Sequence, residues 1–297
     1  MTLATRSAAN LSALERAIVE SVAYSDVFDF PVTAEEIRRT LPLEACAVDV
    51  ASSLAALSDF ITVRDGYSVL RGRENLIETR LRRTEASRTL MGRAAAYGRL
   101  IGGLPFVRMV GVTGSLAVDN AEAGDDIDYL VVTTPGRVWL ARALTIAVVR
   151  LAGLRGLTLC PNYVLAEDAL ALPERDSYTA RELLQMQPVS GQDVYVRMLE
   201  ANPWCLEQYP NWHADRDQSP TRRGVLRRLA EAVLGGRLGN ALERRLLRRK
   251  GRELAAQGTG NGEAVFNEQM CKGHFEAHRS RLEAALAQRM RALELEP

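Results

Sequence analysis

One stretch near the middle of the chain constrains the fold more than any other. An apolar run from Val107 to Val112 leads into Gly114-Ser115, and a second run from Tyr129 to Val132 follows Asp126-Ile127-Asp128. Each run has the length and composition of a buried strand. Successive side chains of a strand point to opposite faces, so Asp126 and Asp128 must share a face. Two carboxylates at that spacing repel each other unless a cation lies between them, which indicates a divalent-metal site.

The Gly-Ser pair suits the approach of a phosphate. Gly114 allows the backbone to come close to a ligand, and Ser115 adds a hydroxyl beside the amides of the turn. A metal ion next to a phosphate-binding turn is the equipment for phosphoryl or nucleotidyl transfer. The competing interpretation is a hairpin that carries two solvated aspartates at the edge of a sheet.

Gly114-Ser115, an interval of ten residues and Asp126-Ile127-Asp128 together resemble the signature of the DNA polymerase β-type nucleotidyltransferase superfamily. The resemblance covers the two strands and the loop between them. It implies that Asp126 and Asp128 are catalytic and bind Mg²⁺ or Mn²⁺, and that Gly114 and Ser115 hold the phosphates of an NTP. We expect ATP as the nucleotide. The acceptor of the NMP group is left open between a small molecule, a protein and an RNA.

The sequence departs from the superfamily pattern on the next expected strand, Leu157 to Leu165. Members of the superfamily usually place a third catalytic carboxylate there, and the matching position holds Asn162. An amide oxygen can bind a metal ion, but an amide cannot act as a general base. Glu167 and Asp168 follow the strand as possible substitutes. Three explanations stay open: the alignment is displaced by a few residues, the acceptor is already anionic and needs no base, or the domain binds a nucleotide and transfers nothing.

A short helix after this strand supplies a further candidate residue. Thr179-x-x-Glu182 predicts a capping box for a helix from Ala180 to Met186. In related enzymes a helix in this place often closes over the nucleotide, so the resemblance makes Arg181 a candidate phosphate ligand. The alternative is an ordinary surface arginine.

The first part of the chain predicts a winged helix-turn-helix. Helices from Leu11 to Tyr24, after a capping box at Thr33–Glu36, and from Ala47 to Leu57 precede a hairpin that turns at Asp65-Gly66. The third helix would enter a DNA groove, but it has no Lys or Arg and carries Asp49. Groove-binding helices need cations for the phosphates and side chains for the base edges. We therefore expect an interaction or structural domain without sequence-specific DNA recognition.

The C-terminal part is expected to be helical and basic. Residues 208–221 are rich in Pro, Asn, Asp and Gln and indicate an exposed linker. Ten Lys and Arg residues lie between Arg222 and Lys250, together with a helical apolar stripe. Such a segment can bind RNA, an acidic partner or a membrane surface, although a helix pair docked on the core is the commoner case. A last helix is expected from Asn267 to Leu293.

The composition is that of an ordinary soluble globular protein, and the length suggests two or three modules. The chain has 297 residues and a net charge of +1, which provides no general attraction to nucleic acid or anionic membranes. The four cysteines lack a paired spacing, and neither a signal peptide nor an apolar run long enough to span a membrane occurs, so we expect a cytoplasmic protein.

Three regions of an α/β protein follow from these observations. We predict a winged-helix-like domain over residues 1–73, a nucleotidyltransferase-like domain with a polymerase β-type sheet and flanking helices over 74–205, and a helical C-terminal region over 206–297. The expected function is metal-dependent transfer of an NMP group from an NTP. The alternative is a catalytically inactive, nucleotide-binding regulatory protein with a winged-helix interaction domain.

Overall fold

The computed structural model describes residues 10–213, 224–253, 264–273 and 278–295. The described residues form an α/β structure with one three-stranded and one six-stranded sheet. The chain divides into two compact units. The first unit comprises Met1–Thr84, Trp204–Ala214 and His278–Pro297, and the second comprises Glu85–Pro203 and Asp215–Ala277. None of the described helices combines the length and the apolar character that a bilayer crossing requires.

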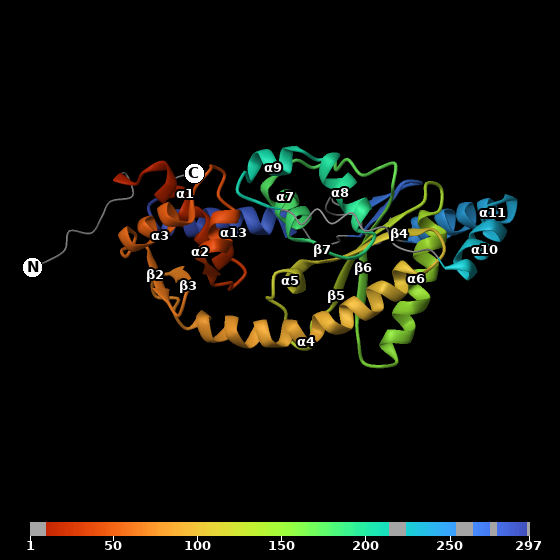
Figure 1. The fold of residues 1–297 in the computed structure, drawn as a ribbon, viewed down its shortest axis with the longest axis horizontal. Coiled ribbons are helices and arrows are strands. Elements are labelled where there is room, and N and C mark those ends of the chain that lie inside the picture. Colours follow the sequence, from red (N-terminus) through yellow and green to blue (C-terminus); the bar gives the residue numbers. More distant parts are fainter. Residues whose placement is uncertain (1–9, 214–223, 254–263, 274–277, 296–297) are drawn as a thin grey trace, which may run out of the picture. The chain divides into compact units, whose positions relative to one another are not determined.

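The first unit joins helices, among them α1, α2 and α3 as labelled in Figure 1, to an antiparallel sheet of order β1-β3-β2. Its elements are α1 (Ala13–Asp26), β1 (Val32–Thr33), α2 (Ala34–Arg39), α3 (Ala47–Ala56), β2 (Ile61–Arg64), β3 (Tyr67–Leu70), the start of α4 (Leu76–Gly102), α9 (Trp204–Gln208) and α13 (His278–Ala292).

Two local predictions in this unit are confirmed. Thr33 and Glu36 form the expected capping box, in which each side chain accepts the backbone amide of the other residue. The hairpin turns at Asp65-Gly66, where φ is 54° and 81°. Positive φ at both central residues is what a two-residue type I′ turn requires, and Asp-Gly supplies it with little strain.

A helix from the end of the chain completes the core of the first unit. Met290 of α13 packs in the same buried cluster as Ile18 of α1. The carboxylate of Asp26, 3% exposed, pairs with Nε of Arg289 at 2.7 Å and with Nε of Arg73 at 3.0 Å. A buried carboxylate is tolerated when cations and hydrogen bonds surround it, so these two arginines tie α13 and the β3–α4 connection to α1.

The second unit contains the mixed sheet of order β7-β4-β5-β6-β9-β8. Its elements are the rest of α4, β4 (Val107–Thr113), α5 (Gly114–Ala117), β5 (Ile127–Thr133), α6 (Val138–Gly153), β6 (Leu159–Ala166), α7 (Ser177–Gln185), β7 (Gln187–Ser190), α8 (Gln192–Glu200), α10 (Val225–Leu234), α11 (Arg237–Leu246), a π-helical turn (Leu247–Gly251), β8 (Val265–Phe266) and β9 (Met270–Lys272). Of the strand pairs in the described part of the chain, β5–β6 alone is parallel, and α6 is the crossover that such a pair needs.

Different helices cover the two faces of this sheet. α4 and α6 pack on one face, where Tyr129 of β5 donates its hydroxyl to the carbonyl of Ala94 at 2.7 Å. Met186, at the end of α7, fills the space above Gly111 of β4, and a Cβ added to Gly111 would collide with it. Tyr129 and Asp128 are successive residues of β5 and therefore point to opposite faces. Asp128 thus lies on the face that α7 approaches.

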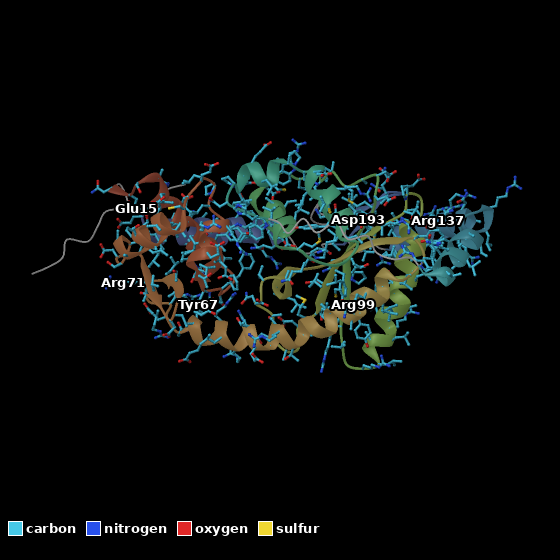
Figure 2. The ribbon with its side chains drawn as sticks, in the orientation of Figure 1. Glu15, Tyr67, Arg71, Arg99, Arg137 and Asp193 are labelled. Atoms are coloured by element: carbon cyan, nitrogen blue, oxygen red, sulfur yellow. The ribbon has the colours of Figure 1, made fainter. Side chains whose placement is uncertain are left out.

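The basic segment forms a helix pair docked on the second unit, as one of the predicted alternatives has it. Both carboxylate oxygens of Glu243 on α11 accept backbone amides at the start of α6, from Trp139 at 2.8 Å and Leu140 at 2.7 Å. These amides have no partner within their own helix, so Glu243 caps α6 from another element. Arg137 (labelled in Figure 2) donates to the side chain of Asn240 at 2.7 Å.

Two expectations about the C-terminal part are wrong. The stretch from Asn267 does not begin a helix, because Met270–Lys272 forms β9 along the edge of β6, and the helix begins at His278. The expected linker is anchored at its start: Asn211 is buried and its side chain bonds the backbone of Leu43 and Ala45. Residues 214–221 of that linker lie outside the described residues.

Candidate active site

The residues of the Gly-Ser and Asp-x-Asp pattern meet at one edge of the six-stranded sheet. β4 ends with Thr113 paired to Asp128, and Cys160 of β6 pairs with Asp128 from the other side. β4 is antiparallel and β6 is parallel to β5, so the end of β4 and the starts of β5 and β6 coincide at this edge. Gly114 follows β4, Asp126 precedes β5, and both therefore belong to the same edge.

Gly114 brings the turn after β4 against the Asp128 carboxylate. Its φ is +68°, and a Cβ at this position would lie 2.7 Å from Oδ2 of Asp128. A side chain would meet both backbone strain and this contact, so the close approach requires glycine. Ser115 is half-buried in the single helical turn of α5, and the side chain of Gln187 donates to the carbonyl of Ala117 at the end of that turn at 2.6 Å.

The two aspartates are held by side chains from β6. Asn162 donates its Nδ2 to Oδ1 of Asp128 at 2.5 Å, and the thiol of Cys160 donates to Oδ2 of Asp126 at 3.3 Å. The β5–β6 register shifts between Asp128 and Leu130, where β6 contains one extra residue before the pairing resumes. Such a bulge redirects side chains at the strand end, and a bulge also tolerates the missing N–H of Pro161. The Cys160 contact had no signal in the sequence pattern.

Burial and neighbouring negative charges disfavour the ionised forms of Asp128 and Cys160. Burial raises the pKa of Asp128 to about 6, the hydrogen bond from Asn162 opposes the rise, and the charges of Asp126 and Asp125 add to it. Burial, together with the charge of Asp126, raises the pKa of the Cys160 thiol to about 12. The thiol therefore stays protonated at neutral pH and acts as a hydrogen-bond donor to Asp126.

A third carboxylate reaches this region from α7. The expected capping box at Thr179–Glu182 is wrong, because α7 begins at Ser177 and the side chain of Asp176 caps it by accepting the Thr179 amide at 2.8 Å. Glu182 precedes Met186 by four residues, so both lie on the helix face that is turned toward the sheet. Burial, followed by the charge of Asp128, raises the pKa of Glu182 to about 7. Sequence spacing gives no signal for this proximity.

The remaining candidates separate into two places. Arg181, next to Glu182 on α7, is 8% exposed and is therefore not the ordinary surface arginine of the alternative interpretation. Glu167 lies at the opposite edge of the sheet, because its amide donates to the carbonyl of Thr133 at 2.8 Å and Thr133 ends β5. Its carboxylate pairs with Arg197 at 3.3 Å. Glu167 and the neighbouring Asp168 are thus too far along β6 to replace Asn162.

The donor set fits a hard divalent cation that is only partly coordinated by the protein. No group of three or more His, Cys, Asp or Glu side chains in the described ranges is arranged to hold a metal ion by itself. Asp126, Asp128 and Asn162 offer carboxylate and amide oxygens, which Mg²⁺ and Mn²⁺ prefer. Mg²⁺ commonly binds through one or two carboxylates and completes its shell with water and substrate phosphates. Burial, and after it the charges of Asp126 and Asp125, raises the pKa of Asp128, and a bound cation would favour the ionised form of this carboxyl group.

Comparisons with protein-family models, with curated proteins and with solved structures find no match for this chain. The turn at Gly114 and the carboxylates of Asp126 and Asp128 are the main elements of the candidate site.

Proposed function

We propose that this protein is a metal-dependent nucleotidyltransferase that moves an NMP group from an NTP, with ATP expected, to an acceptor. The contact between the Gly114 turn and the Asp128 carboxylate carries the proposal, because it joins the candidate phosphate-binding turn to the candidate metal ligands. In the same proposal the six-stranded sheet is a polymerase β-type catalytic sheet, and the first unit is a winged-helix module without sequence-specific DNA binding.

In this proposal different residues of the chain bind the metal ion, bind the phosphates and orient the metal ligands. Asp126 and Asp128 would hold Mg²⁺ or Mn²⁺, which when bound offsets charge on the NTP phosphates. The backbone at Gly114 and the hydroxyl of Ser115 would bind the departing phosphates, and Arg181 is the proposed cationic contact. Asn162 fixes the orientation of Asp128 through its hydrogen bond, in the way that outer-shell partners orient metal ligands.

Glu182 is the proposed proton acceptor for a hydroxyl substrate. Asn162 occupies the place expected for a third carboxylate and cannot accept a proton. Glu182 lies on the sheet-facing side of α7, and a pKa of about 7 is close to the value at which a general base is most effective. An acceptor that is already anionic would need no such base, so the effect of Glu182→Gln distinguishes the two acceptor classes.

The proposal is tested by binding and turnover on the same variants. Titration of Mg·ATP into the full chain should give binding that Asp126→Asn and Asp128→Asn each weaken by about tenfold or more. Asp168→Asn, an exposed aspartate beyond the far end of β6, is the matched control and should bind as the wild type does. Pyrophosphate release should then be measured with each NTP and with hydroxyl-bearing and phosphate-bearing acceptors. Equal Mg·ATP affinity in all four proteins would refute the assignment.

The second candidate function is a regulatory protein that binds a nucleotide without transferring it. Asn162 favours this alternative, because a carboxylate is missing from β6 at the edge where Asp126 and Asp128 meet. A regulator would bind Mg·NTP with the same dependence on the aspartates and release no pyrophosphate. On a hydroxyl acceptor the enzyme would lose turnover in Glu182→Gln while keeping Mg·ATP affinity.

A further inference from the structure

The helix pair α10–α11 carries an exposed apolar stripe. Val225, Leu229 and Val233 follow one another at four-residue intervals on α10 and are 69%, 59% and 68% exposed, and Leu238 of α11 is 58% exposed. Side chains four residues apart lie on the same face of a helix. The three aliphatic side chains of α10 thus share one solvent-exposed face, and α11, which carries the exposed Leu238, lies beside α10 (Figure 1).

The apolar stripe lies on the face of the helix pair that is turned away from the rest of the second unit. Arg227 is buried, donates Nη1 to the carbonyl of Gly102 at 2.9 Å and pairs with Glu231 at 3.1 Å. Glu231 also pairs with Arg108 of β4 at 2.8 Å, and Glu243 caps α6. The inner face is therefore fixed by specific polar contacts, and the aliphatic side chains belong to the outer face.

The outer face is also strongly cationic. The two acidic residues of α10 and α11, Glu231 and Glu243, are engaged at the inner face. Exposed arginines on these helices and the following turn have no ion pair among the described residues; they are Arg228, Arg237, Arg244, Arg245 and Arg248. An apolar stripe bordered by unneutralised cations is the pattern of a helix that lies in the interface of an anionic membrane.

We propose that the outer face of α10–α11 docks on an anionic lipid surface. The aliphatic side chains would enter the boundary between headgroups and acyl chains, and the guanidinium groups would bind lipid phosphates. A nucleic acid would use the cations, whereas phosphate and base contacts give no role to Leu229 and Val233. A second copy of the chain would bring arginines against arginines, so the charges disfavour self-association through this face. The proposal concerns location and is independent of the proposed transfer activity.

The test is flotation of the full chain with vesicles of two compositions. Vesicles of equal parts phosphatidylcholine and phosphatidylglycerol should bind the protein, pure phosphatidylcholine should bind it weakly, and added salt should release it. Leu229→Gln with Val233→Gln should reduce binding to the anionic vesicles by about tenfold or more, since both side chains lose their apolar contact. Each arginine near an anionic surface contributes roughly fivefold, so Arg244→Gln with Arg248→Gln should reduce binding by roughly twenty-five-fold.

A matched control changes one exposed aliphatic residue and one exposed arginine of the first unit. Val48 of α3 is 74% exposed and the side chain of Arg71 is 66% exposed, so Val48→Gln with Arg71→Gln should leave vesicle binding unchanged. Failure of the wild type to bind anionic vesicles at low salt would overturn the proposal, whatever the variants do. So would equal binding by the surface variants and the control. Loss of binding to a single-stranded RNA probe in the surface variants, with no vesicle binding by the wild type, would instead identify a nucleic-acid surface.

Discussion

Replacing Asp128 by asparagine should stabilise the metal-free protein at neutral pH. Asp128 is half-buried beside Gly114 and lies near the charge of Asp126, and its partial burial and this neighbouring charge together disfavour its ionised form. Asparagine has nearly the same shape, carries no charge, and its carbonyl oxygen can still accept the hydrogen bond from Asn162. The substitution thus removes the repulsion while keeping the contact, and it should raise the melting temperature although it removes a proposed metal ligand.

The magnitude follows from the pKa of Asp128, which rises from 3.8 to about 6. A shift of about two units corresponds to about 3 kcal/mol at most, and solvent screening of a half-buried group reduces this to about 2 kcal/mol. Between these two pKa values the folded state holds a proton that the unfolded state has released, so stability falls as pH rises through this window. Above it the penalty is fully present, and Asp128→Asn should raise the melting temperature by about 5 °C.

The assay is thermal unfolding in a chelator, followed by circular dichroism at about pH 7.5 and about pH 5. The increase in melting temperature caused by Asp128→Asn should be full at the higher pH. It should be smaller at the lower pH, where the Asp128 carboxyl of the wild type is largely protonated. Asp168→Asn, on the exposed turn after β6, is the control and should give no gain that depends on pH. Mg²⁺ should then stabilise the wild type more than Asp128→Asn, because only the wild type keeps both proposed carboxylate ligands.

Two results would refute this reasoning. A lower melting temperature for Asp128→Asn at neutral pH would mean that the carboxylate stabilises the fold through a favourable partner. A gain of equal size at both pH values would mean that the effect has nothing to do with the ionisation of Asp128.

Further predictions concern the turn, the β6 contact and the α6 cap. Gly114→Ala should destabilise the folded state by about 1–3 kcal/mol in urea unfolding and should weaken Mg·ATP binding. Gly66 also has a positive φ but has open space for a Cβ, so Gly66→Ala should show the backbone penalty alone in the same assay. Asn162→Asp should lower the metal-free melting temperature and recover it in Mg²⁺, since a second carboxylate would face Asp128; indifference to Mg²⁺ would contradict the site. Glu243→Ala should cost about 2 kcal/mol or more in urea unfolding and Glu243→Gln less, because glutamine keeps one acceptor for the α6 amides; equal losses would exclude the capping role.

Local features of this chain could be predicted from the sequence because short spacings encode them. The capping box at Thr33 and the hairpin turn at Asp65-Gly66 depend on a few neighbouring dihedral angles. The shared face of Asp126 and Asp128 depends on strand alternation, and the interaction between their charges agrees with it. The mixed α/β character follows from the same periodicities.

Where two local signals competed, the sequence alone did not decide between them. Asp176 and Thr179 are both capable of capping α7, and the observed start at Ser177 uses Asp176. Residues 270–272 fit a helical pattern, yet they form β9 because the edge of β6 offers unpaired backbone groups. For β9 the pairing with β6, a strand about one hundred residues earlier in the chain, selects the outcome.

Only the tertiary structure decided which distant residues meet. Asp26 forms ion pairs with Arg73 and Arg289. Asp128 lies near Glu182, which belongs to a helix more than fifty residues later in the chain. The docking of α10–α11 likewise determines that Leu229 faces solvent while Arg227 is buried, the reverse of what their polarities suggest. Periodicity states which residues share a face of one element. Which face is buried, and against what, depends on packing between elements, because the free energy of burial and the pKa of a buried group are properties of the assembled surroundings.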